Sequence, residues 1–187
     1  MFAATLSSIL PFPLHPAVVH LPIALTLLLP PFAVGALWAI HRGAAPRRAW
    51  GIATALFAAL SLSAWLAVET GEQADEQVER VVAEQPIESH EEAARVFLAL
   101  SAGVLGIAVA GLARGRVGRT ARVVSTAGTV ALLGAGWRVG HSGGALVYQH
   151  GAASAYTNRP DPTVARAGSA DRARAPHATT REWADDR

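Results

Sequence analysis

The chain is 187 residues long, with 51% hydrophobic residues, 16% charged residues and a formal net charge of +2, and its mean hydropathy is +0.29. This composition is typical of a membrane protein, and charges that lie in blocks between apolar runs argue against nucleic-acid binding. The absence of cysteine excludes disulfides, thiolate metal sites, iron–sulfur clusters and c-type haem attachment. Any metal site must therefore use His, Asp, Glu or Tyr.

Four apolar runs define the predicted domain. Residues 1–14 carry no basic residue ahead of their hydrophobic stretch, so we expect this segment to stay attached rather than act as a cleaved signal peptide. The runs cover residues 17–40, 50–68, 93–113 and 123–147, and each is long enough for a transmembrane helix. The sequence therefore predicts an all-α fold, an up-down bundle of four transmembrane helices over residues 1–151. Residues 152–187 are predicted to form a disordered polar tail.

Local signals add detail between these runs. Pro22, Pro30 and Pro31 lie inside the first run, where each removes a backbone N–H, so we expect kinks there. Thr70 with Gln73 has the spacing of a capping box. This spacing predicts a short acidic amphipathic helix between the second and third transmembrane helices, ending near residue 85.

The distribution of arginine predicts the orientation. Arginine-rich connections at residues 42–48 and 114–122 follow the first and third runs, whereas the connection after the second run is acidic. Basic connections lie on the cytoplasmic side of bacterial membranes. We therefore predict a multi-pass protein of the bacterial inner membrane with both termini outside.

This topology gathers ionisable residues at the outer ends of the helices. His20 is the most notable, because an ionisable side chain inside a membrane helix usually faces a partner or a cavity. The simpler alternatives are that His15 and His90 only begin helices, that the carboxylates form a solvated loop, and that Arg138 pairs with Glu69 or Glu72. The predicted metal ligands are His15, His20, Glu72, His90, Glu91, His141 and His150.

The fourth run carries a glycine repeat beside two of these histidines. Gly136, Gly140 and Gly144 are four residues apart, a spacing that lets another helix or a flat group approach closely. His141 and Tyr148 share one face of a helix, while His150 points to the opposite side. One straight helix therefore cannot offer both histidines to one site. Either Gly143-Gly144 breaks the helix and folds His150 back, or the two histidines serve different partners.

Three segments of the chain match a known pattern. The family that they resemble is DUF2231, a family of predicted bacterial membrane proteins, and the resemblance runs over roughly residues 14–151. It implies respiratory electron transfer, because similar proteins occur beside or fused to Rieske or cytochrome c domains, although this sequence contains neither. The matching residues are Leu14-His15-Pro16 with Val19-His20-Leu21-Pro22, Thr70-Gly71-Glu72 with Ser89-His90-Glu91, and Gly140-His141 with Gly143-Gly144 and Leu146-Val147-Tyr148-Gln149-His150-Gly151.

Three functional hypotheses follow. In the first, His20 and His141 ligate haem b for electron transfer to a redox partner protein, and Arg138 faces a propionate. Gly140, Gly144 and Tyr148 would then surround the cofactor. In the second, the histidines and carboxylates bind zinc or copper. The third is a membrane packing or assembly subunit, and a homo-oligomer is compatible with all three. An enzyme has the least support, since no nucleophile or metalloprotease motif occurs.

Overall fold

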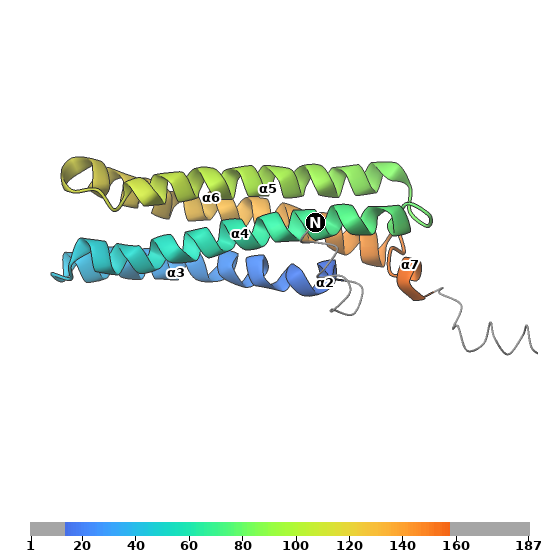
Figure 1. The fold of residues 1–187 in the computed structure, drawn as a ribbon, viewed down its shortest axis with the longest axis horizontal. Helices are drawn as coiled ribbons and strands as arrows, with labels where there is room; N and C mark the ends of the chain where they lie inside the picture. Colours follow the sequence, from blue (N-terminus) through green and yellow to red (C-terminus); the bar gives the residue numbers. More distant parts are fainter. Residues whose placement is uncertain (1–13, 158–187) are drawn as a thin grey trace, which may run out of the picture. The chain divides into compact units, whose positions relative to one another are not determined.

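The fold is that of a computed structural model, in which residues 14–157 are described. The chain divides into two units, Met1–Tyr156 and Thr157–Arg187, and the four long helices belong to the first. The described residues are helical and contain no strand, which confirms the predicted all-α class (Figure 1). The helices are α2 (His15–Val18), α3 (His20–His41), α4 (Pro46–Val78), α5 (Glu84–Ala110), α6 (Gly115–Tyr148) and α7 (Ser154–Thr157).

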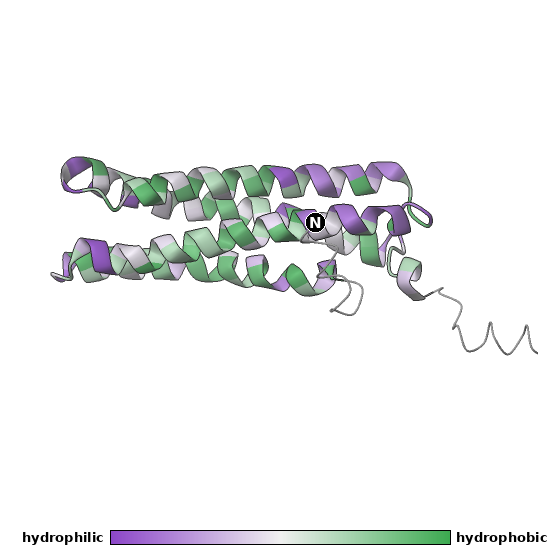
Figure 2. Ribbon diagram, in the orientation of Figure 1, coloured by the Kyte–Doolittle hydropathy of each residue, from purple (hydrophilic) through white to green (hydrophobic). Residues whose placement is uncertain are grey.

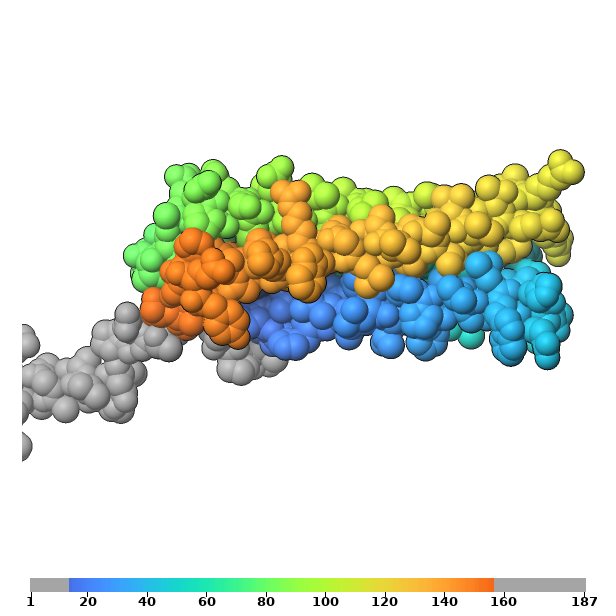
Figure 3. Space-filling view, turned by 180° about the vertical axis from the view of Figure 1, so that it is seen from behind, coloured from blue at the N-terminus to red at the C-terminus, as the bar shows by residue number. Residues whose placement is uncertain are grey.

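The four long helices form an up-down bundle. Each packs against its neighbour in the sequence, and α6 also packs against α3, which closes the bundle. Figure 3 shows α6 lying along α3. The core between the helices is built from side chains that are almost fully buried, namely Leu29, Ala33, Trp50, Phe57, Leu60, Ala108 and Leu132.

Three helices of the described part are long and apolar enough to cross a membrane. They are His15–His41, Pro46–Val78 and Glu84–Ala110. The outward faces are apolar too, since side chains such as Leu27 (63% exposed) and Ile52 (61% exposed) point away from the core. Figure 2 shows hydrophobic residues along the middle of the bundle and hydrophilic residues at its two ends. This pattern indicates a membrane protein, because only lipid offers an apolar environment to the outside of a bundle.

The predicted short acidic helix is not a separate element. The helix α4 continues through Thr70 and Gly71 to Val78, and the Thr70 hydroxyl donates to the carbonyls of Leu66 (2.9 Å) and Ala67 (3.1 Å) instead of capping a new helix. The helix α5 begins at Glu84, ahead of the expected start. Polar residues 69–78 and 84–92 therefore extend α4 and α5 beyond their apolar stretches.

Of the three prolines in the first apolar run, only Pro22 lies next to an irregularity in the helix. The helix α3 continues through Pro30 and Pro31, whereas Val19 lies between α2 and α3 and belongs to neither helix, although its backbone dihedrals stay helical (φ −61°, ψ −21°). Pro22 has no N–H to donate to the carbonyl four residues earlier, that of Val18, so the ladder is interrupted there. The short helix α2 precedes this point and carries His15.

Candidate functional site at the acidic end of the bundle

One end of the bundle brings together α2, the last turns of α4, the first turns of α5 and the last turns of α6 (Figure 1). We call this the acidic end, because all carboxylates of the described residues lie between Glu69 and Glu92. Two of the seven histidines, His15 and His90, are partly buried here. They form the centre of the candidate site.

His15 is fixed to α4. Its Nδ1 lies 2.9 Å from the carbonyl oxygen of Ala67 and 3.4 Å from the hydroxyl of Thr70. A carbonyl oxygen only accepts hydrogen bonds, so Nδ1 carries the proton. In the neutral ring, Nε2 of His15 then keeps a lone pair.

His90 is fixed to α6 in the same way. Its Nδ1 lies 2.9 Å from the Ser142 hydroxyl, which itself donates to the Val139 carbonyl at 3.0 Å. Since the hydroxyl proton is already used, Ser142 accepts from Nδ1–H of His90. Burial, followed by the neighbouring His15, lowers the pKa of His90, while Val139 and Glu91 act in the opposite direction. The ring is therefore neutral near pH 7, with a lone pair on Nε2.

The two rings are arranged edge to face between the helices. Their centroids are 6.3 Å apart and their planes are at 84°. Glycine leaves room for each ring, because a Cβ on Gly71 would lie 3.3 Å from Cε1 of His15 and one on Gly143 would lie 3.0 Å from Cε1 of His90. The helices α4 and α6 thus close tightly around the pair.

A carboxylate cluster adjoins this pair. Burial raises the pKa of Asp75 to about 7, helped by a hydrogen bond with Glu91 and by the negative charges of Glu91, Glu79 and Glu72. Arg95 lies 3.1 Å from Glu91 and 3.7 Å from Glu72. The positive charge of Arg95 thus offsets only part of the negative charge of these carboxylates. The cluster therefore binds a proton up to near neutral pH.

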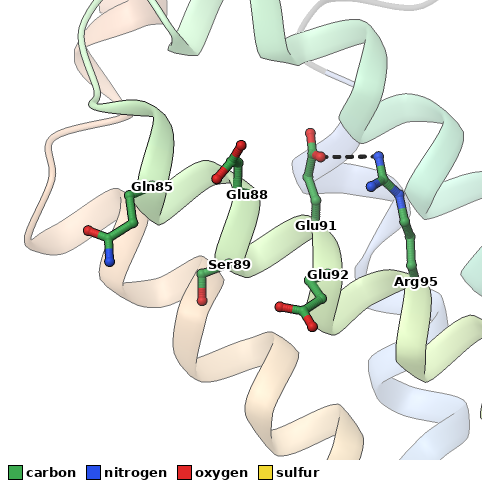
Figure 4. A pocket seen from close by; sticks show the side chains of 6 residues that line it. All are labelled: Gln85, Glu88, Ser89, Glu91, Glu92 and Arg95. Carbon is green, nitrogen blue, oxygen red and sulfur yellow. Dashed lines mark hydrogen bonds and ion pairs between the residues drawn. The ribbon is translucent and has the colours of Figure 1, made fainter.

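The outer side of α5 forms an open pocket beside this cluster. Figure 4 shows that the Glu91 carboxylate points toward Arg95, whereas Glu88 and Glu92 point elsewhere in the pocket. The lining residues are Gln85, Glu88, Ser89, Glu91, Glu92 and Arg95. This pocket is polar and lies outside the space between the two histidines.

The other predicted site residues lie on the surface. His20, His141 and His150 are exposed, and His141 stacks on Trp137 with ring centroids 6.4 Å apart and planes at 16°. Within residues 14–157, no ring contact or hydrogen bond joins His20 to His141.

The remaining residues of α6 also differ from expectation. Arg138 is exposed, and the partner of Glu72 in the described chain is Arg95 rather than Arg138. Tyr148 is 89% exposed, and a Cβ on Gly140 or Gly144 would meet nothing within 4 Å. Within the described chain no other helix approaches these two glycines closely, whereas Gly136 of the same repeat and the neighbouring Gly143 lie against the bundle.

Several residues of the site were not predicted. Ser142, Asp75 and Arg95 hold the histidines and carboxylates in place, yet none belongs to a recognisable motif. The contacts of Ser142 with His90, of Asp75 with Glu91 and of Arg95 with Glu72 join different helices, so spacing carries no signal for them. The pair Glu91 and Arg95 lies within α5 at i,i+4 spacing, which is a local signal. Among the described residues, no group of three or more His, Asp or Glu side chains is arranged to hold a metal ion.

Comparisons of the chain with protein-family models, with curated proteins and with solved structures gave no match.

Proposed function

We propose that the protein is an integral membrane protein that binds a metal centre through Nε2 of His15 and Nε2 of His90. One observation carries the proposal: both Nδ1–H groups are already engaged, by Ala67 and by Ser142. Histidines that ligate metals donate their other ring N–H to a carbonyl or similar acceptor, which fixes the tautomer and the ring. Both rings of the pair show this arrangement.

The separation of the rings supports the same proposal. A metal–nitrogen bond is about 2 Å long, and the ring centroid lies about 1 Å behind the nitrogen, so the centroids of two imidazoles on one ion are about 5 Å apart at the tetrahedral angle and about 6 Å apart on opposite sides of the ion. The observed value is 6.3 Å. Neutral imidazole suits zinc, copper and iron. Because Gly71 and Gly143 let the helices close on the rings, a bare zinc or copper ion fits between them better than a macrocycle.

Haem b is the second candidate, at a different place. A flat group has free access to the outer face of α6, where Gly140 and Gly144 have open space above them and Trp137 stacks on His141. The exposed Arg138 would neutralise a propionate, and His20 and His141 remain the proposed ligands. Bound haem would supply one-electron chemistry, in keeping with the resemblance to DUF2231.

For the membrane arrangement, we propose four crossings, with α6 as the fourth. The helix α6 has 34 residues and packs against both α5 and α3. If α3 and α5 span the membrane, α6 spans it beside them. Arg138 and many glycines lower its hydropathy. Arginine at one end and carboxylates at the other support insertion into the bacterial inner membrane with both termini outside.

Metal analysis and a visible spectrum of the protein purified in mild detergent test these proposals. We expect about one zinc or copper ion per chain, lost in His15→Ala and His90→Ala and retained in the matched variant His150→Ala, whose ring is exposed. Thermal unfolding shows whether each variant is folded. A haem absorption band that disappears in His20→Ala or His141→Ala would favour the second candidate. If folded protein supplied with both metals and haem bound neither, the two histidines would only tie helices together, as in a packing or assembly subunit.

A further inference from the structure

The end of the bundle opposite the histidine pair carries only positive charge. It contains the turn between α3 and α4 and the turn between α5 and α6 (Figure 1). We call it the basic end and define it by its exposed arginines, which are Arg42, Arg47, Arg48, Arg114, Arg116 and Arg119.

No carboxylate of the described chain is available to these arginines. The sequence has no Asp or Glu before Glu69, and none between Glu92 and Asp161. Within residues 14–157, the ion pairs involve Arg95 at the acidic end. The charge of the basic end is therefore not neutralised by the described fold itself.

The positions of several arginines increase the positive potential. Arg47 and Arg48 lie in the first turn of α4, and Arg116 lies in the first turn of α6. The positive end of each helix dipole lies there, and acids are the residues that stabilise it. Neither helix start has a side-chain cap or an acid in its first turn. An anion from outside the chain would relieve this repulsion.

Apolar surface borders the same arginines. Trp38 is 63% exposed, and Val117 is 66% exposed. The Arg42 guanidinium lies 5.5 Å from the centroid of the Trp38 ring. A tryptophan that carries an arginine at the edge of an apolar belt is typical of the level where lipid head groups begin. A soluble acidic protein or a nucleic acid would not need this apolar border.

We propose that the basic end binds the phosphate head groups of anionic phospholipids, whose acyl chains lie along the exposed apolar faces. The phosphates are the missing counter-ions of the six arginines, and Arg is suited to bidentate contacts with phosphate. This site is independent of the metal centre, which lies at the other end.

The test uses the full chain in phosphatidylcholine bilayers that contain a trace of spin-labelled phosphatidylglycerol or spin-labelled phosphatidylcholine. The motionally restricted signal gives the relative affinity for the two lipids. We expect a preference for phosphatidylglycerol of about fivefold or more at low salt, because an arginine near an anionic surface contributes about that factor. The preference should fall as salt is raised.

Two pairs of substitutions locate the site. Arg47→Gln with Arg48→Gln, and Arg116→Gln with Arg119→Gln, should each reduce the preference at least by half. Arg80→Gln and Arg138→Gln, outside the basic end, should leave it unchanged, as should His90→Ala, so failure of the metal proposal would not affect this result.

Three outcomes would overturn the proposal. The first is equal affinity of the unaltered chain for both lipids, or a preference that salt does not lower, and neither requires a variant to fold. The second is a preference that survives both pairs of substitutions. The third is displacement of the lipid by inorganic phosphate but not by sulfate at equal ionic strength, which would show a site for free phosphate.

Discussion

His90 of α5 and Ser142 of α6 are joined by a hydrogen bond of 2.9 Å that determines which nitrogen of the histidine carries its proton. The serine hydroxyl donates to the Val139 carbonyl and accepts from Nδ1–H of His90, which gives all three groups a partner. A contact between two helices thus sets the tautomer of a candidate ligand, 52 residues away in the sequence.

Ser142→Ala tests this relationship. Loss of the acceptor leaves a partly buried N–H unpaired, which should lower the free energy of unfolding by about 1 kcal/mol. If His90 is a ligand, metal affinity should also fall by about 10-fold to 100-fold. Thermal unfolding and metal titration measure the two effects. Ser142→Thr keeps the hydroxyl and should restore both, so a threonine variant as impaired as the alanine variant would contradict the assigned role.

Gly143→Ala and Gly144→Ala form a matched pair on α6. The new methyl at Gly143 would lie 3.0 Å from Cε1 of His90, and the ring cannot move away without losing its hydrogen bond to Ser142. We expect this overpacking to cost about 1–3 kcal/mol, which outweighs the gain of about 0.5–1 kcal/mol from alanine as a helix former. At Gly144 the added methyl meets open space, and alanine should stabilise the helix by about 0.5–1 kcal/mol. The thermal midpoints in detergent should therefore move in opposite directions. Equal shifts would show that the His90 ring is not confined.

Asp75 should make stability depend on pH. Its folded-state pKa of about 7 lies above the ordinary value of 3.8, so the folded chain holds this proton more tightly than the unfolded chain does. The resulting stabilisation is complete below about pH 4 and is lost as the pH rises to about 7. Asp75→Asn should therefore flatten the dependence and raise the thermal midpoint at pH 8. Glu76→Gln is the control, since Glu76 is exposed; an identical pH profile for the asparagine variant and the unaltered protein would rule out this role.

Gly111→Ala tests the packing of Trp50 near the basic end of the bundle. Trp50 is fully buried and its indole N–H donates to the Ala108 carbonyl at 2.9 Å, while a methyl on Gly111 would overlap the indole. Overpacking of this kind costs about 1–3 kcal/mol. Gly106→Ala on the same helix meets open space and should be tolerated. Comparable unfolding temperatures for the two variants would mean that Trp50 is not held as described.

Labelling of single cysteines tests the orientation, and the chain offers a clean background because it has no cysteine. In intact cells, an impermeant thiol reagent should label a cysteine at Gln149 and should not label one at Arg47 or Arg116. Positive residues are retained on the cytoplasmic side, which is the physical reason for this expectation. The reverse labelling pattern would invert the proposed topology.

Composition and hydrophobic runs in the sequence were enough to predict much of the fold. Long apolar runs with arginine or acid between them predict helices, their order and a membrane environment, because each of these depends on residues that are near one another in the chain. The all-α class and three apolar helices were predicted in this way. The boundary near Thr70 was wrong, since a capping motif inside a continuous helix competes with a hydrogen bond to the preceding turn.

The candidate site depended on tertiary structure. The sequence placed five histidines at one end, yet only the packing of four helices decides which of them turn inward. It selects His15 and His90, whose partners Ala67 and Ser142 are each 52 residues away, and it leaves His20 and His141 on the surface. The same packing turns Gly143 toward the core and Gly144 outward, because neighbours on a helix differ by about 100° in direction and no local pattern specifies which face another helix will cover.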